Sequence, residues 1–475
     1  MLTSLLGSED GELHFAFLLS HTLTNDQVPT MENTKALNAM DNAFKKAYIS
    51  KHFSRIEEVL KIVSIIIDSK EKSLLFPYMR QYVKLTGKRF SFWTYLPDKP
   101  SFLSHPAAFG NDDFPLSMID PFRGNQPLLL NNETVAADKW NISYQPQIIL
   151  DSQIMNYVDW YVNDPSKLPG NRLVFVRRLL QYLAANKYFY SPFFYYFESI
   201  SKGSSGPQLR RTFELIARMH CMDTEVMLRD GSFSFDDRRF SELKSTFSVT
   251  TFDDLVDSEM TSAREFSDTM SEQIKLVDII YCIIIKTVLI EKYQPRLSLR
   301  QKFDMIQEFL EDIIQAQFSY EIVAALCYFA GKLHNFFRVQ TKMKHDKAKH
   351  HLQSCAWDLL LLRQPDFFLA FGRPEHTVIS SICSNDRALT EIAGIYRLGS
   401  LLRFLDDDVI LPMHKLDESY MTQLMGNDEF SRIIDTFNLE KTISLFGKNK
   451  EMRMSLESLA NLKHDLEGDL SQLTG

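Results

Sequence analysis

The chain has 475 residues, of which 45% are hydrophobic and 12% aromatic, and this predicts a globular protein of roughly two to four domains. Asp and Glu (61) outnumber Lys and Arg (53), which gives a formal net charge of -8. This balance excludes a surface that attracts nucleic acid over its whole extent. A nucleic-acid partner therefore requires a local basic strip or bound metal ions.

The five cysteines are scattered without CxxC spacing and lie mostly in apolar runs. This pattern predicts buried thiols in a reducing compartment, with neither a disulfide framework nor a zinc site. The N-terminal apolar residues are interrupted by GSEDGE, and the most apolar run, from Leu276, contains Asp278 and Lys286. We therefore expect no signal peptide, no membrane span and a cytoplasmic protein.

Two regions precede the first predicted strand. Residues 1–95 are predicted to form a helical region, because apolar residues recur at intervals of three and four positions over much of it. Residues 96–144 are predicted to form an irregular connector, since seven of the 17 prolines lie between positions 97 and 146 and exclude long helices. The residue types before position 140 do not select among binding of a partner, of another subunit and of substrate.

A short strand that ends at an aspartate is predicted next. The apolar run QIIL lies between Pro146 and Asp151, and the helical spacing of Ile154, Val158 and Tyr161 follows at once. Strand, aspartate and helix therefore occur in immediate succession.

Glu198 lies about two turns inside the next predicted helix. Ser191 and Pro192 are a typical N-cap and first-turn pair, and the five residues between them and the acid are all Phe or Tyr. Glu198 is therefore too deep to be a cap and is embedded in apolar surface. A salt bridge to an arginine, or a solvated helix face, is the alternative to a functional role.

A large helical insertion is predicted at about residues 207–340, after which Asp358 stands in the apolar run AWDLLLLR. A charge beside a core face costs several kcal/mol unless something compensates it. Arg363 is five positions away and poorly placed on a helix to do so. A metal ion is one compensation, and a salt bridge or a solvated face is the alternative.

The succession of strand, aspartate and helix occurs again in SSICSNDRALTEI. Apolar residues give way to Ser384, Asn385 and Asp386, and Leu389 and Ile392 then have helical spacing. As an N-cap, Asp386 would stabilise this helix by roughly 1 kcal/mol, and this is the alternative to a functional carboxylate. The remaining residues, 401–475, are predicted to be helical.

Four segments, IILDSQIMNYV, SPFFYYFES, AWDLLLLR and ICSNDRALTEI, resemble the four acidic motifs of PIN-like domain nucleases in order and local context. In that family two of the acids follow strands, one lies on a helix, and one opens a late helix. The resemblance implies an α/β fold with a PIN-like, Rossmann-like parallel sheet core within residues 145–400, interrupted by the helical insertion. It also implies four catalytic metal ligands, which are Asp151, Glu198, Asp358 and Asp386. The hydroxyl that supports the turn would be that of Ser384.

The chain departs from a compact PIN domain in one respect. Glu198 and Asp358 are 160 positions apart (358 − 198), which is longer than the family usually has. Glu214 or Glu291 could therefore take the place of Glu198.

The resemblance implies Mg²⁺ or Mn²⁺ as cofactor. Paired ions about 4 Å apart stabilise the charge that develops on both the attacking and the leaving oxygen in phosphodiester hydrolysis. Both metals prefer oxygen ligands. Since ligands bind beyond the carboxyl ends of parallel strands, we expect Asp151 and Asp386 at one sheet edge, with helices projecting Glu198 and Asp358 toward it.

A basic stretch, KMKHDKAKHH, lies just before Asp358 and is predicted to receive a phosphate backbone, with a solvated helix face or loop as the alternative. Its candidate phosphate-binding residues are Lys342, Lys344, Lys347 and Lys349. Its three histidines lack a placed carboxylate or cysteine partner for a metal site. The motifs GxxxxGK[ST], GxGxxG, HExxH and GxSxG do not occur, and His376 in FGRPEHT is weakly supported as a base.

Residues and resemblance together predict a metal-dependent ribonuclease, most simply an endonuclease. RNA is preferred to DNA on the resemblance alone. Many PIN-like nucleases are toxins of toxin–antitoxin or phage-defence systems, so the resemblance also implies a growth-inhibitory effector with a regulatory protein or antitoxin as partner, and it is compatible with a homo-oligomer. Two alternatives stay open: a non-catalytic helical scaffold with a degenerate PIN fold, and a structure-specific DNA nuclease.

Overall fold

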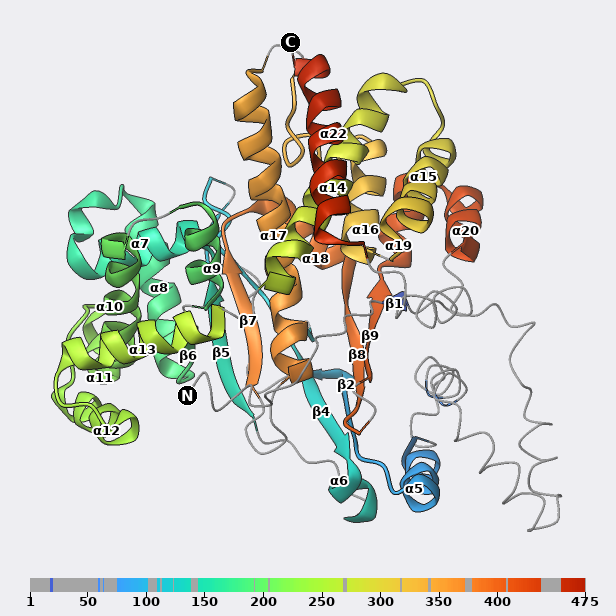
Figure 1. The fold of residues 1–475 in the computed structure, drawn as a ribbon. Coiled ribbons are helices and arrows are strands. Elements are labelled where there is room, and N and C mark those ends of the chain that lie inside the picture. The colour runs from blue at the N-terminus through green and yellow to red at the C-terminus, as the bar shows by residue number, and fades with distance from the viewer. Residues whose placement is uncertain are drawn as a thin grey trace.

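The computed structural model is a mixed α/β protein in which helices pack around two small sheets (Figure 1). It describes residues 75–100, 109–137 and 144–474, and the separate residues 18–19, 59 and 63. Within these ranges the gaps are 112, 123, 192, 204–205, 268–270, 317, 341–342, 372–377, 407–408 and 437–453. Most of the predicted helical region 1–95 therefore lies outside the described residues. Its described helix is α5 (Leu75–Thr86).

The first sheet contains the two predicted strands that end at aspartates. Its strand order is β3-β7-β5-β6, where the bounds are β3 Ser117–Ile119, β5 Gln145–Leu150, β6 Phe189–Ser191 and β7 Val378–Ser384. Strand β5 lies parallel to both β6 and β7, and β3 is antiparallel to β7. All seven residues of β7 are buried, as expected for a parallel strand covered on both faces. The three parallel strands end at the same edge of the sheet.

The second sheet is mostly antiparallel. Its order is β1-β9-β8-β2-β4, where the bounds are β1 Leu18–Leu19, β2 Phe90–Pro100, β4 Asn125–Asn131, β8 Tyr396–Phe404 and β9 Val409–Leu416. Strand β1 pairs parallel with β9, and the other pairs are antiparallel.

The observed strands correct three of the predicted regions. Residues 90–95 belong to β2 and are not helical, and residues 96–144 contain β3, β4 and α6 (Asn132–Ala137). The prolines exclude long helices there but not strands, because β4 is an edge strand and tolerates Pro127. The predicted helical region 401–475 begins with the end of β8 and with β9. Partners far away in sequence fix these strands, as where Phe404 lies opposite Phe90, and local periodicity does not reveal such pairing.

In the rest of the described residues the helical predictions are confirmed. The helices that follow β5 and flank β6 are α7 Ser152–Asn163, a 3₁₀ turn Pro165–Lys167, α8 Asn171–Ala185 and α9 Phe193–Ser201. The insertion consists of α10 Gly206–His220, α11 Thr224–Asp230, α12 Asp237–Phe247, α13 Phe252–Ser267, α14 Ser271–Tyr293, α15 Leu299–Glu308, a π-helical turn Phe309–Ile314 and α16 Ser319–Phe329. The later helices are α17 His345–Phe371, α18 Arg387–Ile395, α19 Glu418–Met425, α20 Asn427–Thr436 and α22 Leu456–Thr474.

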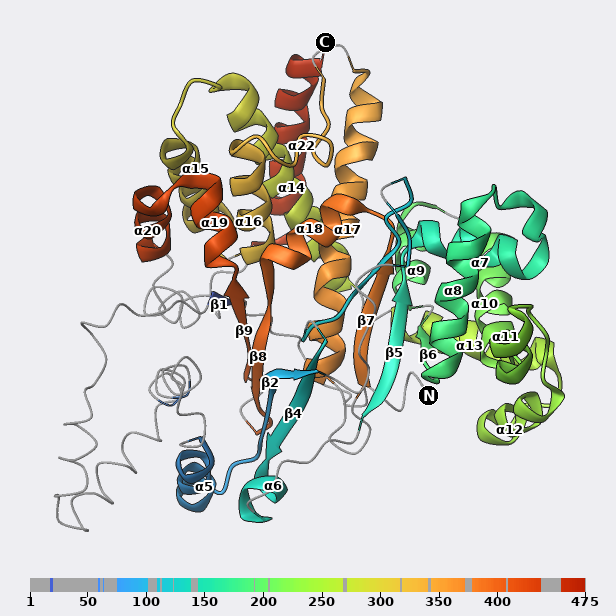
Figure 2. The same cartoon turned by 180° about the vertical axis from the view of Figure 1, so that it is seen from behind.

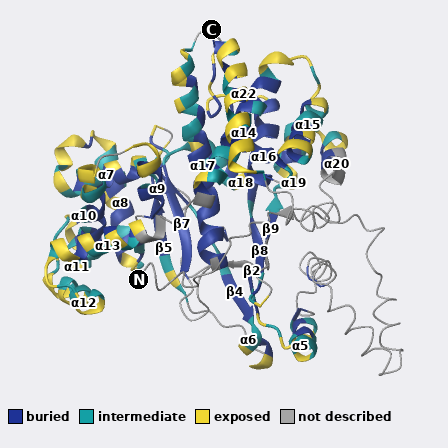
Figure 3. Ribbon diagram, viewed as in Figure 1, coloured by how far each residue is buried: buried dark blue, intermediate teal, exposed yellow. Residues whose placement is uncertain are grey.

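Helix α17 packs between the two sheets. It contacts β7 of the first sheet and β8 of the second, and in both views it runs between them (Figures 1 and 2). Helices α14 and α22 pack on its other side, and these elements form the largest buried apolar cluster. Figure 3 shows the sheets and the sheet-facing part of α17 as largely buried, with exposed residues concentrated on the outer helices. The position of Asp358 on α17 therefore places it beside the core.

The most apolar segment of the sequence is a buried helix, α14. Its residues Ile283 and Ile285 are fully buried, and the Asp278 carboxylate forms an ion pair with Lys463 of α22 at 2.6 Å. In the described part of the chain, every helix is too short or too polar to cross a membrane.

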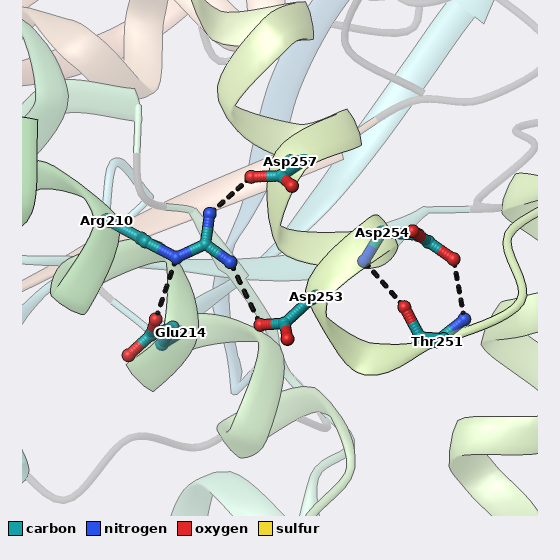
Figure 4. A network of polar contacts seen from close by, with 6 residues as sticks. All are labelled: Arg210, Glu214, Thr251, Asp253, Asp254 and Asp257. Atoms are coloured by element: carbon teal, nitrogen blue, oxygen red, sulfur yellow. Dashed lines mark hydrogen bonds and ion pairs between the residues drawn. The ribbon is translucent and has the colours of Figure 1, made fainter.

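The insertion is held together partly by ion pairs on its surface (Figure 4). The Arg210 guanidinium of α10 contacts Glu214 in its own helix at 3.1 Å, and it contacts Asp253 at 2.9 Å and Asp257 in α13. Thr251 and Asp254 cap the start of α13 reciprocally, since each backbone N–H donates to the other's side chain, at 2.8 and 3.1 Å. These contacts fix α13 against α10.

Candidate acidic site

Asp151 and Asp386 lie at the carboxyl ends of neighbouring parallel strands. Strand β5 ends one residue before Asp151, and the Asp151 N–H continues the pairing by donating to the Cys383 carbonyl of β7 at 3.0 Å. The buried Ser384 side chain joins the two acids. Its Oγ donates to Asp151 Oδ2 at 2.7 Å and accepts from the Asp386 N–H at 3.0 Å. The predicted placement of both aspartates at one sheet edge is confirmed.

Both aspartates also cap helices, as the alternative interpretation predicted for Asp386. Asp386 Oδ1 accepts from the Leu389 N–H at 3.0 Å, and Asp151 Oδ1 accepts from the Gln153 N–H at 3.4 Å. Capping and metal binding are compatible for Asp386, because its Oδ2 accepts no hydrogen bond from the described residues. The cap orients this carboxylate without using all of it.

Helix α9 brings Glu198 to the same edge, because α9 follows directly after β6. The Glu198 side chain is 10% exposed, and its Oε1 contacts Lys202 Nζ at 2.5 Å. Its Oε2 accepts from the Ser152 hydroxyl, and Ser152 is the residue after Asp151. The two glutamates considered as substitutes pair elsewhere, Glu214 with Arg210 at 3.1 Å and Glu291 with Lys302 at 2.8 Å.

Asp358 completes this group from the middle of α17. The resemblance implied that this acid opens its helix, and the structure corrects that expectation, since α17 begins at His345. Arg363 is not its partner, because the Arg363 guanidinium contacts the buried Glu321 at 2.5 Å. In the described ranges no side chain or backbone group donates to the Asp358 carboxylate. Within those ranges the Asp358 side chain is thus a half-buried carboxyl group that accepts no hydrogen bond.

The four acids influence one another electrostatically. Burial raises the pKa of the Asp358 carboxyl well above its usual range, and the charges of Asp151, Asp386 and Glu198 raise it further, while that of Lys202 lowers it. Burial also raises the pKa of Asp151, against the hydrogen bond from Ser384, and Glu198 and Asp386 add to the rise. We call Asp151, Glu198, Asp358 and Asp386 the acid cluster.

The acid cluster offers only carboxylate oxygens, the ligand type that suits Mg²⁺ and Mn²⁺. Asp358, which accepts no hydrogen bond from the described residues, fits such an ion, because a divalent cation would offset the repulsion from the neighbouring carboxylates. Among the residues that the structure describes, no three His, Cys, Asp or Glu side chains converge closely enough to ligate a single ion. The carboxylates thus share an edge of the sheet without meeting at one point.

Two residues that the sequence analysis did not connect with Asp358 lie on the same face of α17. His351 and Cys355 precede Asp358 by seven and three positions, a spacing that places them on one side of a helix. The Cys355 thiol donates to the Phe336 carbonyl at 2.9 Å, and burial followed by the charges of Asp358 and Asp386 raises its pKa. His351 Nε2 accepts from the Arg338 N–H at 3.1 Å, and burial lowers its pKa. Helical periodicity counted back from Asp358 could have identified both.

The predicted basic stretch divides between two faces of α17. Lys347 precedes Asp358 by 11 positions, which at about 100° per residue places both within about 20° of one helical stripe and about 16 Å apart along the axis. Lys344 directly precedes the first residue of α17, and both lysines are exposed. Lys349 points the opposite way and contacts Glu467 of α22 at 2.7 Å, so its predicted phosphate-binding role stays a prediction. Lys342 and His376 lie outside the described residues.

Comparison of the chain with known protein families, with curated proteins and with solved structures finds no match. The resemblance to PIN-like nucleases therefore rests on the four sequence motifs.

Proposed function

We propose that the protein is a metal-dependent ribonuclease of PIN-like type that hydrolyses internal phosphodiester bonds at the acid cluster. The observation that carries this proposal is the placement of four acids, from the ends of β5 and β7 and from α9 and α17, where their charges act on one another, with no hydrogen-bond donor to Asp358 among the described residues. The mutual repulsion of these acids works against folding, because each charge raises the cost of burying the others.

Bound Mg²⁺ or Mn²⁺ would supply charge neutralisation and a water of lowered pKa. The chain would contribute the ligand carboxylates, two of them oriented by helix caps and by Ser384. Glu198 would be oriented by the Ser152 hydroxyl. The exposed Lys347, on the stripe of α17 that leads to Asp358, would hold a phosphate backbone together with the exposed Lys344 just before that helix.

A second candidate, the non-catalytic scaffold, is favoured by the caps formed by Asp151 and Asp386 and by the ion pair of Glu198 with Lys202. These contacts account for three of the acids structurally. They do not explain the half-buried Asp358 carboxyl group. For this reason we prefer the nuclease to the scaffold.

An assay with labelled nucleic acids tests the proposed function. The full chain is incubated with RNA and DNA oligonucleotides of one sequence, labelled at either end, in Mg²⁺ or Mn²⁺. We expect internal cleavage of RNA that chelation abolishes. Selective cleavage of DNA would favour the structure-specific DNA nuclease, and metal-dependent cleavage of neither would favour the scaffold.

We further propose that the nuclease is a growth-inhibitory effector of the cytoplasm, restrained by a regulatory protein or antitoxin or by self-association. Support for a reducing compartment comes from the cysteines, all five of which are free and buried. Induced expression in a bacterial host should arrest growth for the wild type but not for an acid-cluster variant. Equal growth of both strains would contradict the effector role.

Ser384→Ala should reduce Mn²⁺-dependent cleavage by about 10–100-fold, because the hydroxyl orients Asp151 and bonds the Asp386 N–H. It should also lower the free energy of unfolding by about 1–2 kcal/mol. Ser380→Ala is the matched control, since this buried hydroxyl of the same strand bonds Gln147 at 2.9 Å instead. Cleavage rates and urea denaturation of both variants are compared. Equal loss of cleavage in the two would contradict the role of Ser384.

A further inference from the structure

Lys202 places a positive charge inside the acid cluster. It lies one helical turn after Glu198, next to the end of α9, and its Nζ contacts Glu198 Oε1 at 2.5 Å. Its charge also reaches Asp358, opposing the other acids there. The charge of Lys202 therefore acts on two members of the acid cluster, Glu198 and Asp358.

The Glu198 and Lys202 side chains differ in how strongly the surrounding structure restrains them. Glu198 is held by burial and by the Ser152 hydroxyl, whereas 47% of the Lys202 side chain is exposed. A lysine ammonium is a point charge on a flexible stem, and its pairs near solvent are weak. Lys202 can therefore leave Glu198 while the carboxylate stays in place.

We propose that Lys202 is a tethered counter-ion that occupies Glu198 in the metal-free protein and must release it before that carboxylate binds a divalent ion. This inference rests on the proposed function. It assigns Lys202 a regulatory role, since competition for Glu198 sets the concentration of metal at which the acid cluster fills.

Mn²⁺ binding by the full chain, measured by electron paramagnetic resonance, tests the inference. Lys202→Gln should bind Mn²⁺ about 2–5-fold more tightly than the wild type, the size expected for loss of one weak ion pair. Lys167→Gln is the control, because this exposed lysine pairs with Asp164 at 3.5 Å just beyond the far end of α7. Its Mn²⁺ affinity should stay unchanged.

A double-mutant cycle separates direct pairing from the general effect of removing a positive charge. In a Glu198→Gln background, Lys202→Gln should no longer tighten Mn²⁺ binding. Tightening that persists there would overturn the inference.

A second readout does not depend on the affinity of the Glu198→Gln variant. Mg²⁺ should increase the labelling of Lys202 by an amine-reactive reagent, quantified by mass spectrometry, and leave that of Lys167 unchanged. Unchanged labelling of Lys202 in saturating Mg²⁺ would contradict its release.

The outcomes distinguish this inference from the proposed function. If the wild type binds Mn²⁺ and Asp386→Asn does not, but Lys202→Gln has the Mn²⁺ affinity of the wild type, only the role of Lys202 is contradicted. If the wild type does not bind Mn²⁺, the role of Lys202 and the proposed function are both contradicted.

Discussion

Asp386→Asn should reduce Mn²⁺-dependent cleavage of RNA by about 10²–10³-fold, the loss typical of removing one preorganised electrostatic group. The fold should survive, because asparagine caps helices about as well as aspartate does and can still accept from the Leu389 N–H. Stability and activity should therefore separate in this variant. Cleavage rates and thermal unfolding of the metal-free protein are the measurements.

The chain offers a closely matched control in Asp417. Asp417 Oδ1 caps α19 by accepting from the Tyr420 N–H at 3.0 Å, the distance and spacing found for Asp386 and Leu389. Asp417→Asn thus makes the same chemical change at an equivalent cap outside the acid cluster, and its cleavage rate should equal that of the wild type. Similar rates for Asp386→Asn and Asp417→Asn would reduce Asp386 to a structural cap.

Asp358→Asn should stabilise the metal-free protein by about 1–3 kcal/mol, the cost of a buried group left without partners. Burial and three neighbouring negative charges raise the pKa of this carboxyl, so the folded protein favours its protonated form. The cost of ionising it is absent below the ordinary pKa of aspartate, about 3.9. It grows as pH rises and is complete above the raised pKa of the folded state.

The pH dependence of stability tests this directly. Urea denaturation between pH 4 and pH 8, without metal, should show the advantage of Asp358→Asn over the wild type growing with pH. Asp366→Asn is the control on the same helix, because the buried Asp366 carboxylate has a partner in His414 at 2.8 Å and gains nothing from neutralisation. A destabilised Asp358→Asn protein would show that its carboxylate serves the fold.

The strand-to-helix corners were predictable because their signals are local. The buried runs before Asp151 and Asp386 and the helical spacing after them fixed strand, corner and helix in each case. The contact of Ser384 with Asp151 was not predictable in the same way, because it depends on the register in which Leu150 lies opposite Cys383. That register joins segments more than 200 positions apart.

Strands β8 and β9 show why the C-terminal prediction was wrong. Tyr396–Phe404 contains enough leucine to fit a helix, and its strand conformation is decided by pairing with β2 and β9. The acid cluster gives the complementary case. Apolar neighbours marked Glu198 and Asp358 as unusual. The pair of Glu198 with Lys202 has the i, i+4 spacing of a helix and could have been predicted, whereas the lack of a donor to Asp358 among the described residues depends on how α17 packs.

Calorimetric titration of Mn²⁺ into the wild type and into Asp151→Asn/Asp386→Asn is the most direct test of the acid cluster as a metal site. We predict saturable binding to the wild type and at least about 10-fold weaker binding to the double variant, which keeps both helix caps but lacks two ligand charges. Equal binding by the two proteins, or none by either, would contradict a metal site built from these acids.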